Sequence, residues 1–415
     1  MKKKTNKINK FKTKSLRKKK RKKKINKKSI KANNKGKYIK IFFISLFLFI
    51  IYIKNTNILG DYSTNNILEL KTYSKFEKMK KIYIKDEFFK PSLDNITLLS
   101  HLYHKKSYNY KKNKNIIHIC QSLNNKYIYQ ALVSISTVLM NCNYSSTFII
   151  YHVLCNPDVT NNTLTILKSL MNKYYSNLEI IFYDMGKTFI NRFDHYYSQS
   201  TYYRLLTPIF LDTDRLIYLD GDSITLKDLN EMYRLSLDDN YVLGFLDVLS
   251  GGVDYLGVKS EKYICAGVIL LNLEKIRNDN KTYQLINISK SNVKLRHVDQ
   301  TIINYVFYPK IGIFPDNIGI WNFYDRGDIE KYLTFLRTKK DINQLEKALL
   351  DPVIIHCVLC SPKIWSPHSK FNEALTACKK RGDCDCKKFH NLWHFYANKT
   401  DYYKDILKSL NMISG

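Results

Sequence analysis

The chain has 415 residues, of which 45% are hydrophobic, and it contains nine cysteines. This apolar content is enough for a sizeable core, and so few cysteines in so long a chain exclude a fold held together mainly by disulfides. The formal net charge of +32 is uneven, because residues 1–40 hold 21 lysines and arginines and no acidic residue. The other residues carry 47 basic and 36 acidic side chains, so the basic balance says little about their chemistry.

The N-terminus combines a basic arm with an apolar run. Residues 1–40 are of low complexity and cannot bury a core. Residues 41–53 are apolar and lie between Lys40 and Lys54. As a helix they span about 20 Å, short of the roughly 30 Å hydrocarbon core, but the flanking lysines can snorkel to the interface. We expect an uncleaved signal anchor of a type II membrane protein, with the arm in the cytosol and the rest in the lumen of the Golgi or endoplasmic reticulum.

Two alternatives to the anchor stay open. A cleaved signal peptide has an apolar region of about this length, although residues 55–60 offer no small-x-small cleavage site. A nucleic-acid-binding role for the basic arm is the other alternative. Against it, Phe11 is the only aromatic residue within residues 1–36, unlike the aromatic platforms that bind single strands.

After the anchor, residues 54–112 are polar and are expected to form a stem with a helix around residues 68–85. Strand and helix patterns then alternate. We predict strands over residues 116–120, 147–154, 178–183 and 216–219, and helices over residues 127–140, 164–175 and 202–210. This alternation is typical of an α/β fold, a mostly parallel sheet with helices on both faces, whose ligands bind at the carboxyl ends of the strands. The expected catalytic domain covers residues 113–410.

The most informative residues are Asp220 and Asp222, which follow the strand at residues 216–219. Two carboxylates at a strand end can hold a hard divalent cation, and a cation there can neutralise a diphosphate leaving group. A solvated turn is the alternative, since residues 212–214 form a second Asp-x-Asp sequence. With 14 glycines in the chain and no Gly-rich loop, phosphate binding by a glycine cradle is not expected, which increases the need for a metal.

Four further blocks accompany this pair, at residues 201–210, 263–277, 297–304 and 355–365. In order and spacing the five blocks resemble glycosyltransferase family 8, which includes glycogenins and bacterial lipopolysaccharide galactosyl- and glucosyltransferases. The resemblance runs from about residue 116 to about residue 406. It implies a GT-A-type fold and a Mn²⁺-dependent, retaining transfer of a hexose or related sugar from a UDP-sugar to a glycan, glycoprotein or glycolipid acceptor.

The resemblance also implies roles for individual residues. Asp220, Asp222 and His356 are the implied metal ligands. Lys363 would place its charge on the β-phosphate, and Arg204 would help to hold the donor sugar or diphosphate. The structural alternatives are a packed core histidine, a surface lysine and an arginine paired with a carboxylate on a helix surface.

Other implied roles concern the sugar and the base. Asp299 and Gln300 would lie at the transferred sugar, with Gln300 as a weak nucleophile or as a stabiliser of an oxocarbenium-like centre. Gly267 would let the backbone approach the sugar closely, and the alternative is that it serves packing only. The remaining donor-binding residues are Asn124 and Tyr127 near the base, and Gly221 between the two aspartates.

The chain departs from the family pattern at three places. Asn124 and Asn125 stand where paired acids are usual, and Cys265 stands where asparagine is usual. The C-terminal motif lacks its glycine and has one extra residue between His356 and Lys363. Lys363 therefore either reaches the diphosphate or turns into solvent. A non-catalytic nucleotide-sugar-binding relative stays open as an alternative function.

A cysteine and histidine cluster near the C-terminus is the last feature. Cys378, Cys384 and Cys386 precede His390 and His394 with a spacing that is not standard for zinc. Residues 390–397 are expected to be helical, and the alternatives for the cysteines are zinc, a luminal disulfide or free thiols.

Overall fold

The computed structural model divides the chain into two units, residues 1–68 and 69–415, and only the second contains residues whose structure is described. The described residues are 72, 74–77, 96–102, 114–174, 177–189, 198–247, 256–291, 295–315, 318, 320–323, 350–357, 363–366 and 386–412. The basic arm, the expected anchor and most of the expected stem lie outside them. Across the described part of the chain, no helix combines the length and apolar character needed to cross a bilayer.

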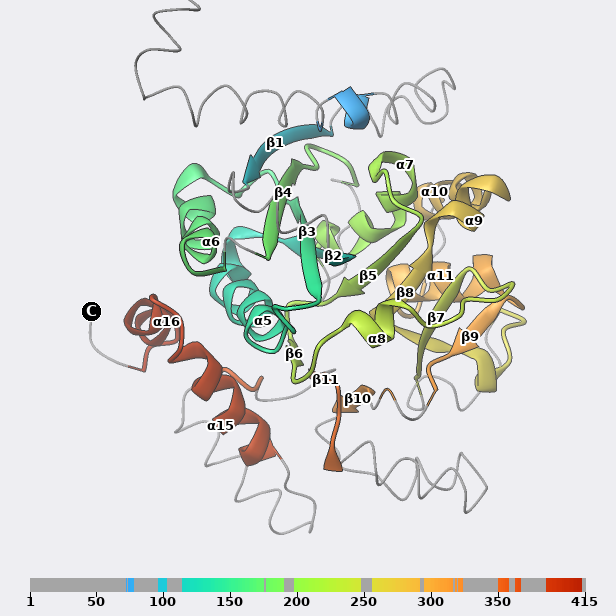
Figure 1. The fold of residues 1–415 in the computed structure, drawn as a ribbon. Helices are drawn as coiled ribbons and strands as arrows, with labels where there is room; N and C mark the ends of the chain where they lie inside the picture. The colour runs from blue at the N-terminus through green and yellow to red at the C-terminus, as the bar shows by residue number, and fades with distance from the viewer. Residues whose placement is uncertain are drawn as a thin grey trace, which may run out of the picture. The chain divides into compact units, whose positions relative to one another are not determined.

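The centre of this unit is an eight-stranded mixed sheet in the order β1-β4-β3-β2-β5-β8-β7-β9 (Figure 1). Its strands are β1 (Thr97–Leu102), β2 (Asn115–Leu123), β3 (Thr147–Cys155), β4 (Leu178–Asp184), β5 (Arg215–Leu219), β7 (Val242–Leu246), β8 (Ile264–Asn272) and β9 (Ile311–Ile313). The four strands β4, β3, β2 and β5 run parallel, whereas β1 and β8 are antiparallel to their neighbours.

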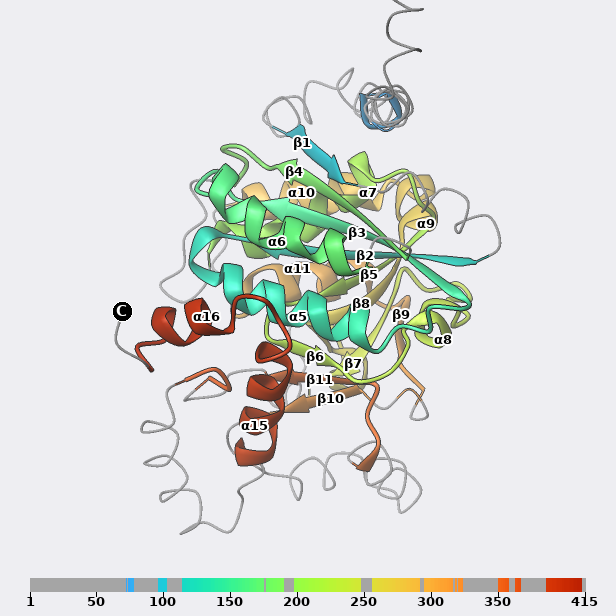
Figure 2. The ribbon, with the colours of Figure 1, turned by 60° about the vertical axis from the view of Figure 1, so that its left-hand side comes forward.

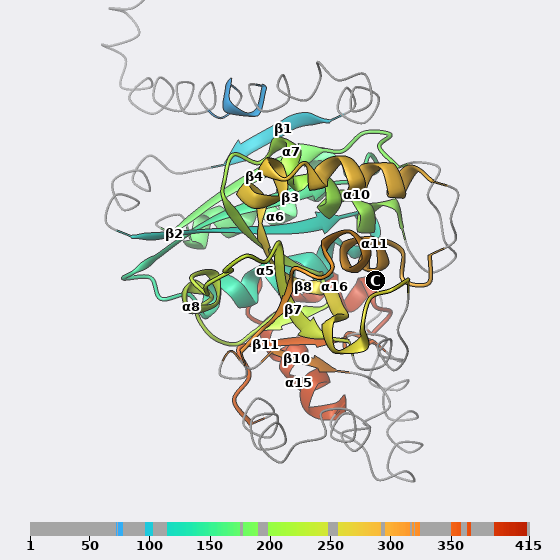
Figure 3. The same ribbon diagram turned by 90° about the vertical axis from the view of Figure 1, so that its right-hand side faces the viewer.

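Helices cover both faces of the sheet (Figure 2). One face packs against α5 (Ile128–Met140), α6 (Asn161–Tyr174) and the short α8 (Asn230–Tyr233). The other face packs against the 3-10 helix η2 (Gln199–Leu206) and helices α7 (Thr207–Phe210), α9 (Leu273–Asn278), α10 (Lys281–Lys290) and α11 (Val298–Phe307), several of which face the viewer in Figure 3. Both faces are covered because both are apolar. In β3, alternate side chains point to opposite faces: Ile149 and Tyr151 pack on the α5 side, and Phe148 and Ile150 pack on the η2 side.

A second, three-stranded sheet carries part of the candidate site. It consists of β10 (Ile320–Phe323), β11 (Ile354–Cys357) and β6 (Ser223–Thr225), with β11 in the middle. Ile355 of β11 and Ile224 of β6 pack in a third core with Trp393 of α15 (Cys386–Ala397), which α16 (Tyr403–Ser409) follows. Pairing with β6 and packing against α15 thus place His356 of β11 opposite Ser223, at the start of β6.

The predicted elements are confirmed, with longer bounds for several strands and one change of helix type. The segment at residues 202–210 is a 3-10 helix, η2, followed by one turn of α-helix, α7. The described residues of the expected stem helix, 72 and 74–77, are helical. The segment assigned to the stem also contains β1, which pairs with β4 and extends the sheet upstream of residue 113. The expected mostly parallel character is confirmed, because β1 and β8 run against the other strands, and the remaining six strands of this sheet share one direction.

One buried amide fixes helix α11 to the sheet. The side chain of Asn304 is fully buried, and its Oδ1 accepts a hydrogen bond from the Ile264 N–H at 2.8 Å. Its Nδ2 donates to the carbonyl of the same residue, also at 2.8 Å. Because Ile264 opens β8, this pair of bonds sets the position of α11 against the strand that carries Gly267.

We predict that Asn304→Ala lowers the free energy of unfolding by about 2–4 kcal/mol, since a buried N–H and a buried C=O both lose their partner. Denaturant titration measures this. The neighbouring Tyr305→Ala, at a side chain that is 49% exposed, is the control and should change stability by less than about 1 kcal/mol. Equal effects of the two substitutions would contradict the role given to Asn304.

Candidate active site

The two aspartates lie on a tight turn that joins the two sheets. Asp220 follows β5, and its backbone N–H donates to the Gly267 carbonyl of β8 at 2.8 Å. Asp222 precedes β6, and its carbonyl accepts from the Cys357 N–H of β11 at 3.0 Å. The hydroxyl of Ser223 donates to the Asp220 carbonyl at 2.7 Å and closes the turn. The backbone of the turn is therefore held on both sides, which fixes where the carboxylates point.

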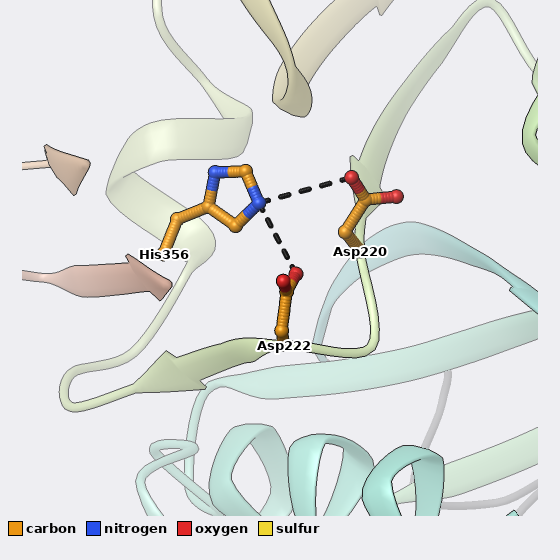
Figure 4. Close-up of side chains that lie close together, drawn as sticks. All are labelled: Asp220, Asp222 and His356. Atoms are coloured by element: carbon orange, nitrogen blue, oxygen red, sulfur yellow. Dashed lines mark ion pairs between the residues drawn. The ribbon is translucent and has the colours of Figure 1, made fainter. Parts of the chain in front are cut away.

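His356 of β11 faces both carboxylates (Figure 4). Its Nε2 lies 3.2 Å from Asp222 Oδ1 and 3.7 Å from Asp220 Oδ2. One ligand atom from each of these three residues lies within 4.8 Å of the other two, close enough for all three to bind one metal ion. The structure thus brings together the three residues that the sequence indicated as metal ligands. His356 comes from β11, and the two aspartates come from a turn that lies much earlier in the chain.

The charges of this cluster are strongly coupled. Burial by itself would raise the pKa of Asp222, but the nearby Lys363 and His356 hold that pKa below its usual range. Burial by itself would lower the pKa of His356, but Asp222 and then Cys265 raise it well above its usual value. An imidazole must lose its proton to bind a metal, so cation binding by this cluster is linked to proton release and weakens as pH falls.

Gly267 of β8 lies directly against the cluster. A Cβ at this position would lie 2.1 Å from His356 Cε1 and 2.7 Å from Asp220 Oδ2. Both distances are well inside van der Waals contact, so a larger residue would displace two of the three ligands. The packing of the cluster therefore requires a glycine here, whereas the predicted approach of the backbone to the sugar stays a prediction.

Lys363 reaches the cluster despite the extra residue in its motif. Its Nζ donates to Asp222 Oδ2 at 2.8 Å and to the Cys357 carbonyl at 3.1 Å. It also lies 5.6 Å from the centre of the Trp365 ring. The alternative in which the longer segment turns Lys363 into solvent does not match this structure.

Arg204 of η2 is a buried arginine, 4% exposed, and not the surface residue of the alternative interpretation. Its Nη2 pairs with Asp220 Oδ1 at 2.8 Å and its Nε with Asp299 Oδ2 at 3.0 Å. Its Nη1 donates to the Ala266 carbonyl, and the guanidinium lies 4.0 Å from the centre of the Tyr218 ring. Arg204 thus joins the aspartate turn to α11.

Asp299 and Gln300 open α11 on the other side of Arg204. Burial raises the pKa of Asp299 to about 6, even though Arg204 acts to lower it. Gln300 accepts from the Ala266 N–H at 3.1 Å through Oε1 and donates to Asp247 Oδ2 at 2.7 Å through Nε2. The orientation of the Gln300 amide is therefore fixed by a backbone group and by a buried carboxylate.

A polar cleft of about 520 Å³ opens beside the cluster. Its lining includes all of the predicted donor-binding residues except Gly267, namely Asn124, Tyr127, Arg204, Asp220, Gly221, Asp222 and Lys363. Tyr127 is 41% exposed and stands edge-to-face with Trp365, with 6.3 Å between ring centres. The side chain of Asn124 accepts from the Tyr127 N–H at 3.1 Å, so this amide orders the backbone at the mouth of the cleft.

Three residues of the site were not assigned from the sequence. Asp247 holds Gln300, Trp365 lines the cleft, and Cys265 lies with its Sγ 3.8 Å from His356 Nδ1. Asp247 follows the buried strand β7 just as Asp220 follows β5, and this pattern of a carboxylate after an apolar strand could have indicated it. The expected helix at residues 390–397 is part of α15, whereas Cys378 and Cys384 lie outside the described residues. Among the described cysteines, Cys120, Cys142, Cys155 and Cys265 are free thiols.

Comparison with known proteins identifies the family. The model of glycosyl transferase family 8 matches residues 118–367, which include the aspartate turn, Gly267, Gln300, His356 and Lys363. The chain belongs to glycosyl transferase family 8. It is therefore a member of a family of glycosyltransferases, as the order of its motifs indicated.

Named relatives of this family 8 chain are bacterial. It is 24% identical over 204 residues to the glycosyltransferase GlyE of Streptococcus pneumoniae, covering 48% of this chain and 47% of GlyE. It is 26% identical over 208 residues to a lipopolysaccharide 1,2-glucosyltransferase of Escherichia coli, covering 46% of this chain and 59% of that enzyme. The chain thus spans about half the length of the curated relatives it matches.

The fold is also found among solved structures. The apo structure of the bifunctional glycosyltransferase WbbM superposes with a TM-score of 0.56 and 20% identity, over 71% of this chain and 51% of that one. At this identity the likeness supports the fold alone. It agrees with the GT-A-like arrangement expected for the family, a mixed sheet covered by helices on both faces.

We predict that Gly267→Ala weakens binding of a divalent cation, measured with Mn²⁺ by electron paramagnetic resonance, by at least about 10-fold, because its Cβ would push His356 and Asp220 apart. Circular dichroism should show an intact fold. Unchanged Mn²⁺ affinity in the folded variant would mean that these two side chains are not both ligands.

Proposed function

We propose that this chain is a retaining glycosyltransferase that transfers a hexose or a related sugar from a UDP-sugar to a glycan, glycoprotein or glycolipid, with Mn²⁺ as its cofactor. The observation that carries the proposal is that Asp220 and Asp222, whose carboxylates meet the buried His356, line the polar cleft. Family membership supplies the reaction type. The donor, the acceptor, the cofactor and the stereochemical outcome are inferences.

The residues of the cluster fit a Mn²⁺ ion. Two carboxylates and one imidazole are a ligand set of the hardness that Mn²⁺ prefers. Their donor atoms are already close together, and Gly267 leaves the space in which they meet. When bound, the ion would offset the negative charge that develops on a departing nucleoside diphosphate.

The protein side chains supply the remaining functions. Lys363 places an ammonium group on the cleft wall beside the cluster, where it can stabilise a diphosphate. Arg204, Asp299 and Gln300 hold the anomeric centre. Arg204 pairs with Asp299, and Gln300 is bonded to the Ala266 N–H and to Asp247, so all three side chains are restrained. The exposed face of Tyr127 offers an aromatic surface for the base of the nucleotide.

A non-catalytic nucleotide-sugar-binding relative is the alternative function. The observation that favours it is Asn124, an amide in place of the usual acid, whose oxygen already accepts from the Tyr127 N–H. Both functions require donor binding, but only the enzyme releases UDP. A screen of UDP-sugars for Mn²⁺-dependent UDP release separates them and also identifies the donor sugar.

Substitution of the aspartate turn tests the metal. Asp222→Asn keeps the shape of the side chain but removes one charge, and we predict that Mn²⁺-dependent UDP release falls by about 100-fold or more. Asp214→Asn, in the other Asp-x-Asp sequence, is the control, because its side chain is 78% exposed and should leave turnover unchanged. Equal activity of Asp222→Asn and the wild type would show that the aspartate turn does not bind the catalytic metal.

We further propose that residues 41–53 anchor the protein as a type II membrane protein of the Golgi or endoplasmic reticulum, with the catalytic domain in the lumen. The support is the apolar run itself and the lysines on its N-terminal side.

The expected result of fractionation is full-length protein retained in carbonate-washed membranes. In sealed vesicles, added protease should remove only the basic arm and leave the residues after the anchor intact. A soluble product that begins near residue 60 would indicate a cleaved signal peptide. Full-length protein in the nucleus would favour the nucleic-acid role of the basic arm.

A further inference from the structure

Lys363 faces the metal cluster and the donor cleft at the same time. Its ammonium group lies 2.8 Å from Asp222 Oδ2, and its side chain, 35% exposed, lines the cleft. A second bond, to the Cys357 carbonyl at 3.1 Å, holds the ammonium at this junction. One charge at this position can therefore act on both ligands of the proposed reaction.

The two oxygens of Asp222 face two different nitrogen groups. Oδ1 faces His356 Nε2 at 3.2 Å, on the side of the candidate metal site, and Oδ2 faces Lys363. A cation bound by Oδ1 would therefore have the fixed positive charge of Lys363 only one carboxylate away. Like charges at such a distance repel appreciably, because the site is partly shielded from water. Lys363 thus opposes a divalent cation, while it attracts a diphosphate.

We propose that Lys363 couples the two ligands, so that Mn²⁺ and the nucleoside diphosphate bind tightly only together. The ammonium weakens binding of the cation alone, and a diphosphate in the cleft removes this penalty by balancing the positive charge. Coupling of this kind is reciprocal, so each ligand raises the affinity for the other by the same factor. This inference rests on the proposed function and adds a mechanism that favours loading of metal and donor as a pair.

The test measures two affinities in the full-length protein and in Lys363→Met. Without nucleotide, Mn²⁺ affinity, from the free-ion signal in electron paramagnetic resonance, should rise about 10-fold in the variant. With saturating Mn²⁺, UDP affinity from calorimetry should fall by about 10- to 150-fold. The two changes have opposite signs, which a general loss of site structure cannot produce.

Two further variants control for charge and for shape. Lys227→Met removes a lysine that pairs with Asp351 away from the cleft, so it makes the same change in net charge and should alter neither affinity. Lys363→Arg keeps the charge, and its Mn²⁺ affinity should stay within about threefold of the wild type. Lys363→Gln repeats the neutral substitution with a polar side chain, should the methionine variant fold poorly.

The outcomes separate the coupling from the proposed function. If the wild type binds Mn²⁺ and UDP, and the neutral variants bind Mn²⁺ equally or more weakly, Lys363 does not oppose the cation and the coupling is wrong. If the wild type binds neither Mn²⁺ nor UDP, the proposed function fails instead. Tighter Mn²⁺ binding with unchanged UDP affinity would also contradict the coupling, since Lys363 would then contact the metal site alone.

Discussion

Two carboxylates on one tight turn place two negative charges at a partly buried position, and the described side chains around them balance those charges. Arg204 pairs with Asp220, Lys363 pairs with Asp222, and His356 faces both. These three groups come from η2, from β11 and from the segment after β11. The second sheet thus brings His356 to the end of β5, while η2, on the first sheet, brings Arg204.

The site has a rigid half and a half that faces the cleft. On the rigid side, Arg204 and Asp299 are almost fully buried, and Asn304 and Gln300 fasten α11 to β8 through backbone groups. On the cleft side, Lys363 is partly exposed and Tyr127 more so. The residues proposed to hold the anomeric centre thus lie in the buried scaffold, whereas those proposed for the phosphate and the base lie at the exposed side of the cleft.

Strand and helix periodicities predicted most of the fold, and the order of the motifs, through the family resemblance, indicated the residues that the structure brings together around Asp220 and Asp222. These patterns could not predict which side chains contact each other across long sequence separations. The sequence left open whether Lys363 reaches the site, and the structure answers through a hydrogen bond to Asp222, which lies 141 residues earlier. Strand β1 was missed because its segment is polar and Lys/Tyr-rich with weak periodicity. The antiparallel direction of β8 was not predicted, because an apolar run does not indicate the direction of a strand in the sheet. Asp247 was missed since its role depends on Gln300, a partner from another element.

The central claim is that Asp220, Asp222 and His356 hold the metal that serves the donor diphosphate. Crystals grown with Mn²⁺ and UDP, measured at the manganese absorption edge, test it directly. The account predicts one strong anomalous peak bound by these three side chains and by the diphosphate of UDP, with Lys363 in contact with the phosphate. A peak bound by other residues, or UDP bound in the cleft with no anomalous peak beside it, would contradict the account.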